Sequence, residues 1–163
     1  LMKRRYKRKI FKERLNKINS IIPNCGIGVD VIVGFPGETE EDFLETYHYL
    51  SELKISYLHV FTYSERPDTD AINMIGIVSR EDRANRSKML HVLSEKKKES
   101  FYLSQKNSIK EVLFESEINN QISGWTKNYI RFSGLGSKEL ENKILNVYLK
   151  SFKNGMMRGH IAN

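Results

Sequence analysis

The sequence predicts an α/β segment with a parallel sheet, followed by a small all-β barrel. First, helical and strand patterns alternate between residues 8 and 63 with short connections, the order typical of a parallel sheet. Second, a long helical pattern follows this alternation. Third, from residue 106 onward the sequence changes to short β-rich runs separated by Asn, Gly and Ser clusters. We therefore predict two domains, residues 1–105 and residues 106–163.

The first helix is predicted over residues 8–22, where apolar residues recur at spacings of three and four. Pro23 and Gly26 end it. A β-branched apolar run follows over residues 29–35 and is bounded by glycines. Since such runs are typical of parallel strands covered on both faces, we expect this strand to be buried.

The second helix is predicted to begin after Thr39. Asp42 stands three residues beyond this threonine and makes an acidic variant of the capping box. A second strand is predicted over residues 57–63. The order predicts right-handed βα units, whose ligand-facing edge lies at the carboxyl ends of the strands, here residues 34–38 and 63–67.

A long third helix is predicted from Ser79, again with an aspartate three residues on, to about Ser104. Lys96, Lys97 and Lys98 are predicted to lie on or near its exposed face. Five short strands should follow. They cover residues 109–115, 121–123, 129–132, 143–150 and 156–161. Because strands this short would expose their edges in an open sheet, we predict a closed barrel.

The composition excludes several classes of protein. The chain has 163 residues and a formal net charge of +7, and no apolar stretch approaches the ~20 residues that a membrane span needs. Its one cysteine, Cys25, excludes an internal disulfide framework and any site built from several thiolates of this chain. The four histidines lie on separate elements without metal-ligand spacing. We expect a cytoplasmic protein with no metal site and no membrane partner.

The charge is unevenly distributed. Residues 1–20 hold nine Lys or Arg against one acid, whereas residues 21–70 hold two against ten. Basic ends flanking an acidic middle fit a polyanion partner. Helices that carry solvated lysines explain the same pattern equally well.

Two segments are candidates for ligand binding. The turn over residues 34–39 joins a strand to a helix N-terminus, where free backbone N–H groups can meet an anion, although glycines serving only a tight turn are the favoured explanation. In the C-terminal part, aromatic and basic residues interleave. They are Trp125, Lys127, Tyr129 and Arg131. Small barrels stack bases and hold phosphates in this way, but a basic strand with core aromatics is an equal alternative.

Three segments carry a family resemblance. Residues 2–6 are MKRRY, residues 30–43 are DVIVGFPGETEEDF, and residues 61–71 are FTYSERPDTDA. In order and spacing they resemble the second half of the radical S-adenosylmethionine barrel of tRNA methylthiotransferases. From about residue 106 the chain is similar to the TRAM domain, a small OB-like RNA-binding barrel. The resemblance implies a partial (βα) barrel fragment followed by a TRAM barrel.

The segment over residues 124–130 suggests one branch of this family. It is similar to the Gly-aromatic-Thr-x-Asn-Tyr segment of enzymes that add a methylthio group to N6-threonylcarbamoyladenosine next to the anticodon. The resemblance thus implies a fragment of such an enzyme, with the anticodon arm of tRNA as partner and no DNA. Two alternatives remain: the isopentenyladenosine branch, and a stand-alone tRNA-binding or partner-binding module without catalysis.

The resemblance also implies cofactors and residue roles. The complete enzymes use S-adenosylmethionine and two [4Fe–4S] clusters, and the cysteines that hold those clusters are absent from this chain. We therefore expect it to be inactive alone, with no catalytic residue of its own. The cofactor-binding residues that the resemblance implies are Arg4, Ile32, Gly34, Pro36, Tyr63 and Ser64. Among these, Gly34 is expected to border the adenosyl group, and Arg4 to meet the methionyl carboxylate or a tRNA phosphate.

Overall fold

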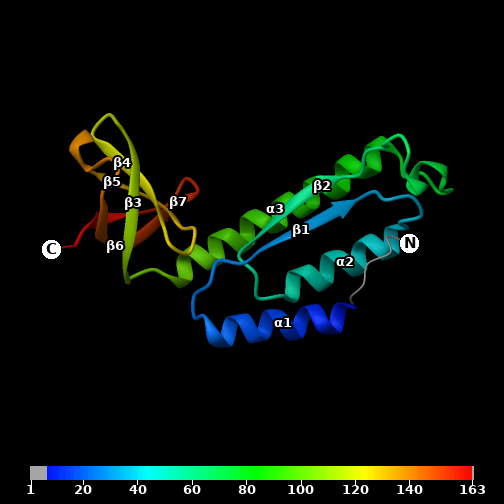
Figure 1. The fold of residues 1–163 in the computed structure, drawn as a ribbon, viewed down its shortest axis with the longest axis horizontal. Helices are drawn as coiled ribbons and strands as arrows, with labels where there is room; N and C mark the ends of the chain where they lie inside the picture. Colours follow the sequence, from blue (N-terminus) through cyan, green and yellow to red (C-terminus); the bar gives the residue numbers. More distant parts are fainter. Residues whose placement is uncertain (1–6, 163) are drawn as a thin grey trace. The chain divides into compact units, whose positions relative to one another are not determined.

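The computed structural model describes residues 7–162, which form two compact units (Figure 1). The α/β unit is formed by residues up to Ile18 and by Ile27–Lys97. The β unit is formed by Asn19–Gly26 and by the residues from Lys98 onward. The division falls within two helices, so each of these helices contributes residues to both units.

The α/β unit alternates helices and strands in the predicted order. Its elements are α1 (Arg8–Ile21), β1 (Gly28–Val33), α2 (Glu40–Glu52), β2 (Tyr57–Thr62), the 3-10 helix η1 (Asp70–Asn73) and α3 (Arg80–Ser104). Strands β1 and β2 pair in parallel, from Gly28 opposite Tyr57 to Val33 opposite Thr62. The mixed helix-and-sheet architecture and the parallel pairing are confirmed.

The helices cover one face of this sheet. Val29, Val31 and Val33 pack into the core, whereas Asp30 between them is exposed. On β2, Phe61 remains 52% exposed. The prediction that both faces of β1 are covered is therefore wrong within the described residues. The reason is the alternation of the strand, which points every second side chain away from the helices.

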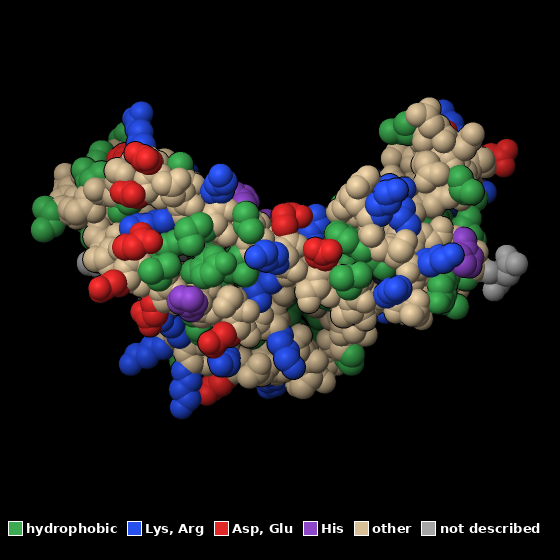
Figure 2. Space-filling model, turned by 180° about the vertical axis from the view of Figure 1, so that it is seen from behind, with side chains coloured by type: hydrophobic (Ala, Val, Ile, Leu, Met, Phe, Trp, Pro, Cys, Tyr) green, Lys and Arg blue, Asp and Glu red, His purple; other side chains and the backbone are tan. Residues whose placement is uncertain are grey.

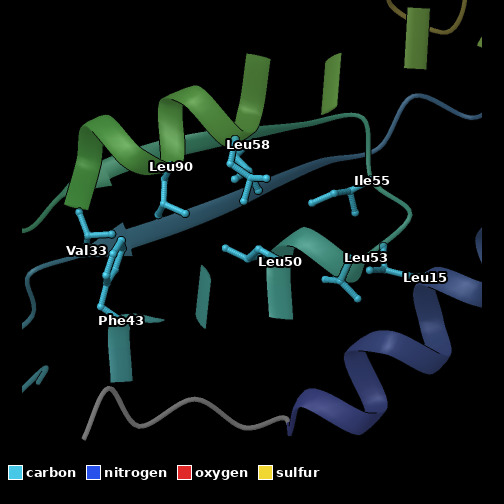
Figure 3. Packing of buried hydrophobic residues seen from close by; sticks show 9 residues of the cluster. Leu15, Val33, Phe43, Leu50, Leu53, Ile55, Leu58 and Leu90 are labelled. Carbon is cyan, nitrogen blue, oxygen red and sulfur yellow. The ribbon is translucent and has the colours of Figure 1, made fainter. Parts of the chain in front are cut away.

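The core of the α/β unit lies between the sheet and the three helices (Figure 3). Its buried side chains come from α1, β1, α2, β2 and α3 and from the connection between α2 and β2. They are Leu15, Val33, Phe43, Leu50, Leu53, Ile55, Leu58, Leu90 and Leu93. Full burial of one such side chain contributes about 1.5–3 kcal/mol, so this cluster holds the helices on the sheet.

Both predicted helix caps are present. The Thr39 hydroxyl accepts from the Asp42 backbone N–H at 3.1 Å, and the Asp42 carboxylate accepts from the Thr39 N–H at 3.0 Å. At the start of α3 the Ser79 hydroxyl accepts from the Asp82 N–H at 3.0 Å. These bonds satisfy N–H groups that a helix leaves without partners.

The capping bond predicts a pH dependence. The backbone N–H of Thr39, and then its hydroxyl, lower the pKa of Asp42 below its ordinary value of 3.8. A carboxyl with a depressed folded pKa stabilises the fold above pH 3.8, and this contribution is lost as the pH falls through the lower folded value. We expect the Tm of Asp42→Asn to fall less steeply than wild type below pH 3.8 in circular dichroism melts. Parallel curves for the two proteins would contradict this.

Lys97, predicted on or near the exposed face of α3, is half-buried. Its Nζ donates to the backbone carbonyls of Ser51 at 3.0 Å and Leu53 at 2.7 Å, and burial lowers its pKa. The long lysine stem reaches across to the end of α2, where carbonyls lack helical partners.

The β unit contains five strands. They are β3 (Ile109–Ile118), β4 (Gln121–Thr126), β5 (Arg131–Leu135), β6 (Ile144–Lys153) and β7 (Met156–Ile161), with the 3-10 helix η2 (Lys138–Leu140) after β5. The pairing order β3-β4-β5-β7-β6 closes on itself, because β3 also pairs with β6. Only the β5–β7 pairing is parallel. Every described strand of this unit thus has a partner on both sides.

The ring of strands encloses a second core. Its fully buried strand residues include Phe114, Phe132, Val147 and Leu149. Gly159 on β7 lies where two strands approach closely, since a Cβ there would stand 1.7 Å from the Tyr148 carbonyl oxygen. Within residues 7–162 there is no helix long and apolar enough to cross a membrane.

Candidate functional site

The carboxyl ends of β1 and β2 meet at one edge of the sheet. A cavity of about 560 Å³ opens there. Its lining residues are Ile32, Phe35, Phe61, Thr62, Tyr63, Ser64, Arg66, Thr69 and Ala71. Three of the predicted cofactor residues, Ile32, Tyr63 and Ser64, are therefore brought together.

The other predicted cofactor residues lie elsewhere. Gly34 and Pro36 do not line the cavity, and Pro36 is fully buried. Gly34 has a φ of +76°, and a Cβ on it would stand 2.3 Å from Cγ of Arg83. The open side of this glycine is thus filled by an arginine rather than left for a ligand. Arg4 lies outside the described residues.

The backbone N–H groups of the turn after β1 already donate to acceptors of the protein. The Glu38 carboxylate accepts from the Gly34 N–H at 2.7 Å, and the Gly37 N–H donates to the Gly76 carbonyl at 2.8 Å. Glu38 and Thr39 donate their N–H groups to Phe35 and Asp42. These contacts favour the explanation of a tight turn over that of an anion cradle.

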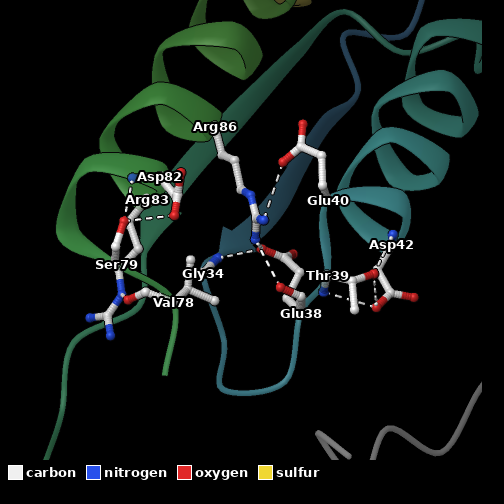
Figure 4. Close-up of polar contacts among 10 residues, drawn as sticks. All are labelled: Gly34, Glu38, Thr39, Glu40, Asp42, Val78, Ser79, Asp82, Arg83 and Arg86. Atoms are coloured by element: carbon white, nitrogen blue, oxygen red, sulfur yellow. Dashed lines mark hydrogen bonds and ion pairs between the residues drawn. The ribbon is translucent and has the colours of Figure 1, made fainter. Parts of the chain in front are cut away.

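Arg86 of α3 anchors this turn (Figure 4). Its guanidinium donates to the Glu38 carboxylate at 2.8 Å, to the Glu38 carbonyl at 3.1 Å and to Glu40 at 3.2 Å. The Arg86 side chain is 7% exposed and that of Glu38 is 16% exposed. A nearly buried ion pair therefore fixes the first loop of the edge.

Arg83 anchors the loop after β2. It donates to the carbonyls of Val78 at 2.9 Å and Tyr63 at 3.1 Å, and to the Glu65 carboxylate at 2.7 Å. The hydrogen bond from Arg83 is the main cause that lowers the pKa of Glu65. Sequence reasoning missed Arg83 and Arg86. The signal that could have found them is two arginines three residues apart at the start of a helix, facing an acidic region.

Tyr63 has a polar group without a partner. Its hydroxyl oxygen is buried and makes no hydrogen bond, while its ring packs edge-on against Phe35 at 5.4 Å between ring centroids. An unmade hydrogen bond of this kind costs about 1–3 kcal/mol. The cavity combines apolar walls at Ile32 and Phe61 with polar lining residues such as Ser64, which fits a ligand with an apolar ring and polar edges.

The part of the chain that the structure describes holds no group of three or more His, Cys, Asp or Glu side chains that could bind a metal. The chain has a single cysteine, Cys25. These residues do not fit an iron–sulfur cluster, whose usual ligands are several thiolates.

The β unit carries the predicted aromatic and basic cluster on one face around the β4–β5 turn. We call Trp125, Lys127, Tyr129 and Arg131 the aromatic face. The Arg131 guanidinium lies 4.9 Å from the Trp125 ring centroid, and the Trp125 and Tyr129 rings are 6.5 Å apart. Trp125 is 37% exposed and Tyr129 is 67% exposed. The alternative that the aromatic residues of this segment belong to the core is therefore wrong for Trp125. It is correct for Phe132, which is fully buried.

Both cations of the aromatic face are paired with acids of β3. Lys127 forms an ion pair with Glu111, and Arg131 with Glu115 at 2.5 Å. A cavity of about 520 Å³ lies beside them and is lined by Leu113, Ile144, these two acids and part of the aromatic face. Sequence reasoning missed Glu111 and Glu115, because the pairing of β3 with β4 brings them beside the cations.

Charges elsewhere are also interspersed. On the face that Figure 2 shows, Lys and Arg side chains alternate with acidic side chains and with hydrophobic patches instead of forming one continuous basic surface. The aromatic face combines the exposed rings of Trp125 and Tyr129 with cations that acids already neutralise.

A second cavity in the β unit, of about 550 Å³, contains Cys25 and the turn over residues 126–129 in its lining. Its walls are tied by their own hydrogen bonds. Asn128 donates to the Asn24 carbonyl at 2.8 Å, and Gln105 donates to the Asn24 side chain at 2.9 Å. These bonds give the asparagines a structural role.

Comparison with known proteins identifies relatives over most of the chain. It is 37% identical over 151 residues to the threonylcarbamoyladenosine tRNA methylthiotransferase MtaB of Bacillus subtilis, a match to 90% of this chain and 34% of that protein. It is 41% identical over 140 residues to MtaB of Aquifex aeolicus, covering 86% and 33%. It is 32% identical over 168 residues to the tRNA-2-methylthio-N(6)-dimethylallyladenosine synthase of Aliarcobacter butzleri, covering 99% and 38%.

The chain thus spans about a third of the length of the curated relatives it matches. No protein-family model matches it.

Proposed function

The chain is homologous to tRNA methylthiotransferases over almost its whole length, and on this premise we propose that it is the C-terminal part of such an enzyme. The observation that carries the proposal is the 37% identity over 151 residues to MtaB. In this proposal the α/β unit is part of the radical S-adenosylmethionine barrel and the β unit is a TRAM domain. The helix-free face of the sheet, with Ile32 and Phe61, corresponds to the inside of the barrel.

We propose the threonylcarbamoyladenosine branch as the finer assignment. The identities to the two MtaB proteins, 37% and 41%, exceed the 32% to the dimethylallyladenosine synthase of Aliarcobacter butzleri. The Asn128-Tyr129 pair, which resembles the segment of that branch, supports the same choice. The substrate would be N6-threonylcarbamoyladenosine next to the anticodon.

In this proposal the cavity at the sheet edge would hold S-adenosylmethionine. Ile32 and Phe61 would contact the adenine ring, and Tyr63 and Ser64 would border the polar groups of the cofactor. S-adenosylmethionine supplies the methyl group and the radical chemistry when bound. Gly34 and Pro36 would shape the turn rather than touch the cofactor, and Arg4 stays a candidate for its carboxylate or for a tRNA phosphate.

In this proposal, residues of this chain position the cofactor. Arg83 and Arg86 fix the two loops that border the cavity, so the groups that would meet the ligand are held in place. The residues present do not fit the iron–sulfur clusters of the family.

The aromatic face would bind the anticodon arm of tRNA. In the full 163-residue chain, replacing Lys127 and Arg131 with alanine removes two cations and leaves Glu111 and Glu115 without partners, so tRNA affinity should fall. The salt dependence of binding should flatten by less than the roughly two slope units that two free cations would give, because Glu111 and Glu115 already pair with these cations. Filter binding at several salt concentrations measures both effects.

The matched control is the Lys150→Ala, Lys153→Ala double variant, which removes the same charge from exposed positions of β6. It should bind tRNA as wild type does. Equal losses of tRNA affinity in both double variants would contradict the proposal that the aromatic face binds tRNA. Anticodon stem-loops carrying either threonylcarbamoyladenosine or isopentenyladenosine separate the branches, since the first should bind more tightly.

A further inference from the structure

Tyr129 has an unusual backbone conformation. Its φ is +62°, in the left-handed region that bulky side chains avoid. Among the described residues, every other non-glycine with a positive φ is an asparagine or aspartate, the residue types that tolerate this region. A tyrosine here costs conformational energy that asparagine or glycine would save, so folding alone does not explain it.

Hydrogen bonds hold this conformation in place. The Tyr129 N–H donates to the Thr126 carbonyl at 3.0 Å. The hydroxyl of Tyr102, a buried residue, donates to the Tyr129 carbonyl at 3.2 Å and accepts from the Arg131 N–H at 3.0 Å. The result is a ring that is 67% exposed on a backbone fixed from both sides.

The ring stands beside two further flat groups. Trp125 lies 6.5 Å away between ring centroids, and the Arg131 guanidinium lies 4.9 Å from the Trp125 ring centroid. Aromatic rings and guanidinium planes are the surfaces on which unpaired bases stack. The paired acids, Glu111 and Glu115, meanwhile neutralise the cations that would attract any phosphate backbone.

We propose that the aromatic face is a preorganised platform for an unpaired RNA base, and that Glu111 and Glu115 make it select single-stranded over duplex RNA. Duplex RNA offers mainly phosphates and hydroxyl groups, because its bases are stacked in the helix. A face whose cations are already paired gains little from phosphates and depends on stacking. This inference rests on the proposed RNA-binding function and names its substrate class.

Trp125 is the only tryptophan of the chain, so its fluorescence reports on the platform directly. The probes are a single-stranded oligouridine and a blunt RNA duplex of equal length, titrated into the full chain. The single strand should quench Trp125 and bind more tightly than the duplex. Tyr129→Gly should weaken single-strand binding roughly 5- to 150-fold without lowering the Tm, because the backbone strain is relieved.

Two variants are matched controls for Tyr129→Gly. Tyr129→Phe keeps the ring and should bind as wild type, and Leu135→Ala, which removes a side chain 75% exposed elsewhere on the unit, should also leave binding unchanged. A lower Tm in Tyr129→Gly, or an unchanged affinity of this variant for the single strand, would overturn the proposal that the aromatic face is a preorganised platform.

The acids are tested by the Glu111→Gln, Glu115→Gln double variant. Freeing two cations should raise duplex affinity and steepen its salt dependence by about two slope units. Unchanged duplex binding in this variant overturns the role of the acids. Wild-type chain that binds duplex at least as tightly as single strand overturns the inference but keeps the RNA-binding proposal. Absence of binding to either RNA overturns both.

Discussion

Arg86→Leu is expected to destabilise the α/β unit by about 3–5 kcal/mol, because it leaves a nearly buried carboxylate without its cation. The Glu38 carboxylate, 16% exposed, accepts from Arg86 at 2.8 Å and from the Gly34 N–H at 2.7 Å. Once the arginine is gone, only the backbone bond offsets the desolvation of this charge. Urea unfolding followed by circular dichroism measures the loss.

The Arg86→Leu, Glu38→Gln double variant tests the cause. Since it removes the uncompensated charge as well, it should recover a large part of the stability. A single variant that loses less than about 1 kcal/mol would show that the ion pair is only a surface contact.

Gly159→Val is expected to prevent the ring of strands from closing. A Cβ at this position would stand 1.7 Å from the Tyr148 carbonyl oxygen, and this neighbour is backbone that pairs within the sheet. No rotamer change relieves such an overlap, so the loss should exceed about 4–5 kcal/mol, the exceptional range for one substitution. The Trp125 fluorescence and the dispersion of amide signals should both become those of an unfolded β unit.

Gly155→Ala in the same hairpin is the matched control. This glycine has a φ of +75°, but nothing lies within 4 Å of a Cβ built on it. The variant should cost only about 1–2 kcal/mol of backbone strain and keep the fold. Similar losses at both positions would contradict the steric explanation.

Local features of the fold could be predicted from the sequence. The caps at Thr39 and Ser79 and the five strands of the β unit follow from patterns within about ten residues of chain, and the parallel pairing of β1 with β2 follows from the alternating order of helices and strands. The strand predicted over residues 129–132 begins two residues later, at Arg131, because Tyr129 occupies the turn instead.

Contacts of individual side chains with distant parts of the chain could not be predicted. Arg86 reaches Glu38 across 48 positions, and Lys97 reaches the end of α2 across more than 40. Neither composition nor hydrophobic periodicity indicates which distant side chains will pair in the folded chain. At the candidate sites, the residue types of the aromatic face were predictable, whereas the acids that pair with it and the arginines that hold the sheet edge depend on tertiary structure.

The closed pairing order of the β unit also sets how this unit folds. Strands β3 and β4, and strands β6 and β7, are joined by two-residue turns with positive φ at Asn119-Asn120 and Asn154-Gly155, so each hairpin forms locally, within about 1–10 μs. Closing the ring requires β3 to pair with β6, with Ile109 opposite Tyr148, and β5 to pair with β7. The loop entropy of these distant pairings must be overcome before they stabilise anything, so they are the slow step. We therefore expect the refolding rate of the β unit to be set by the closing of the ring rather than by the formation of either hairpin.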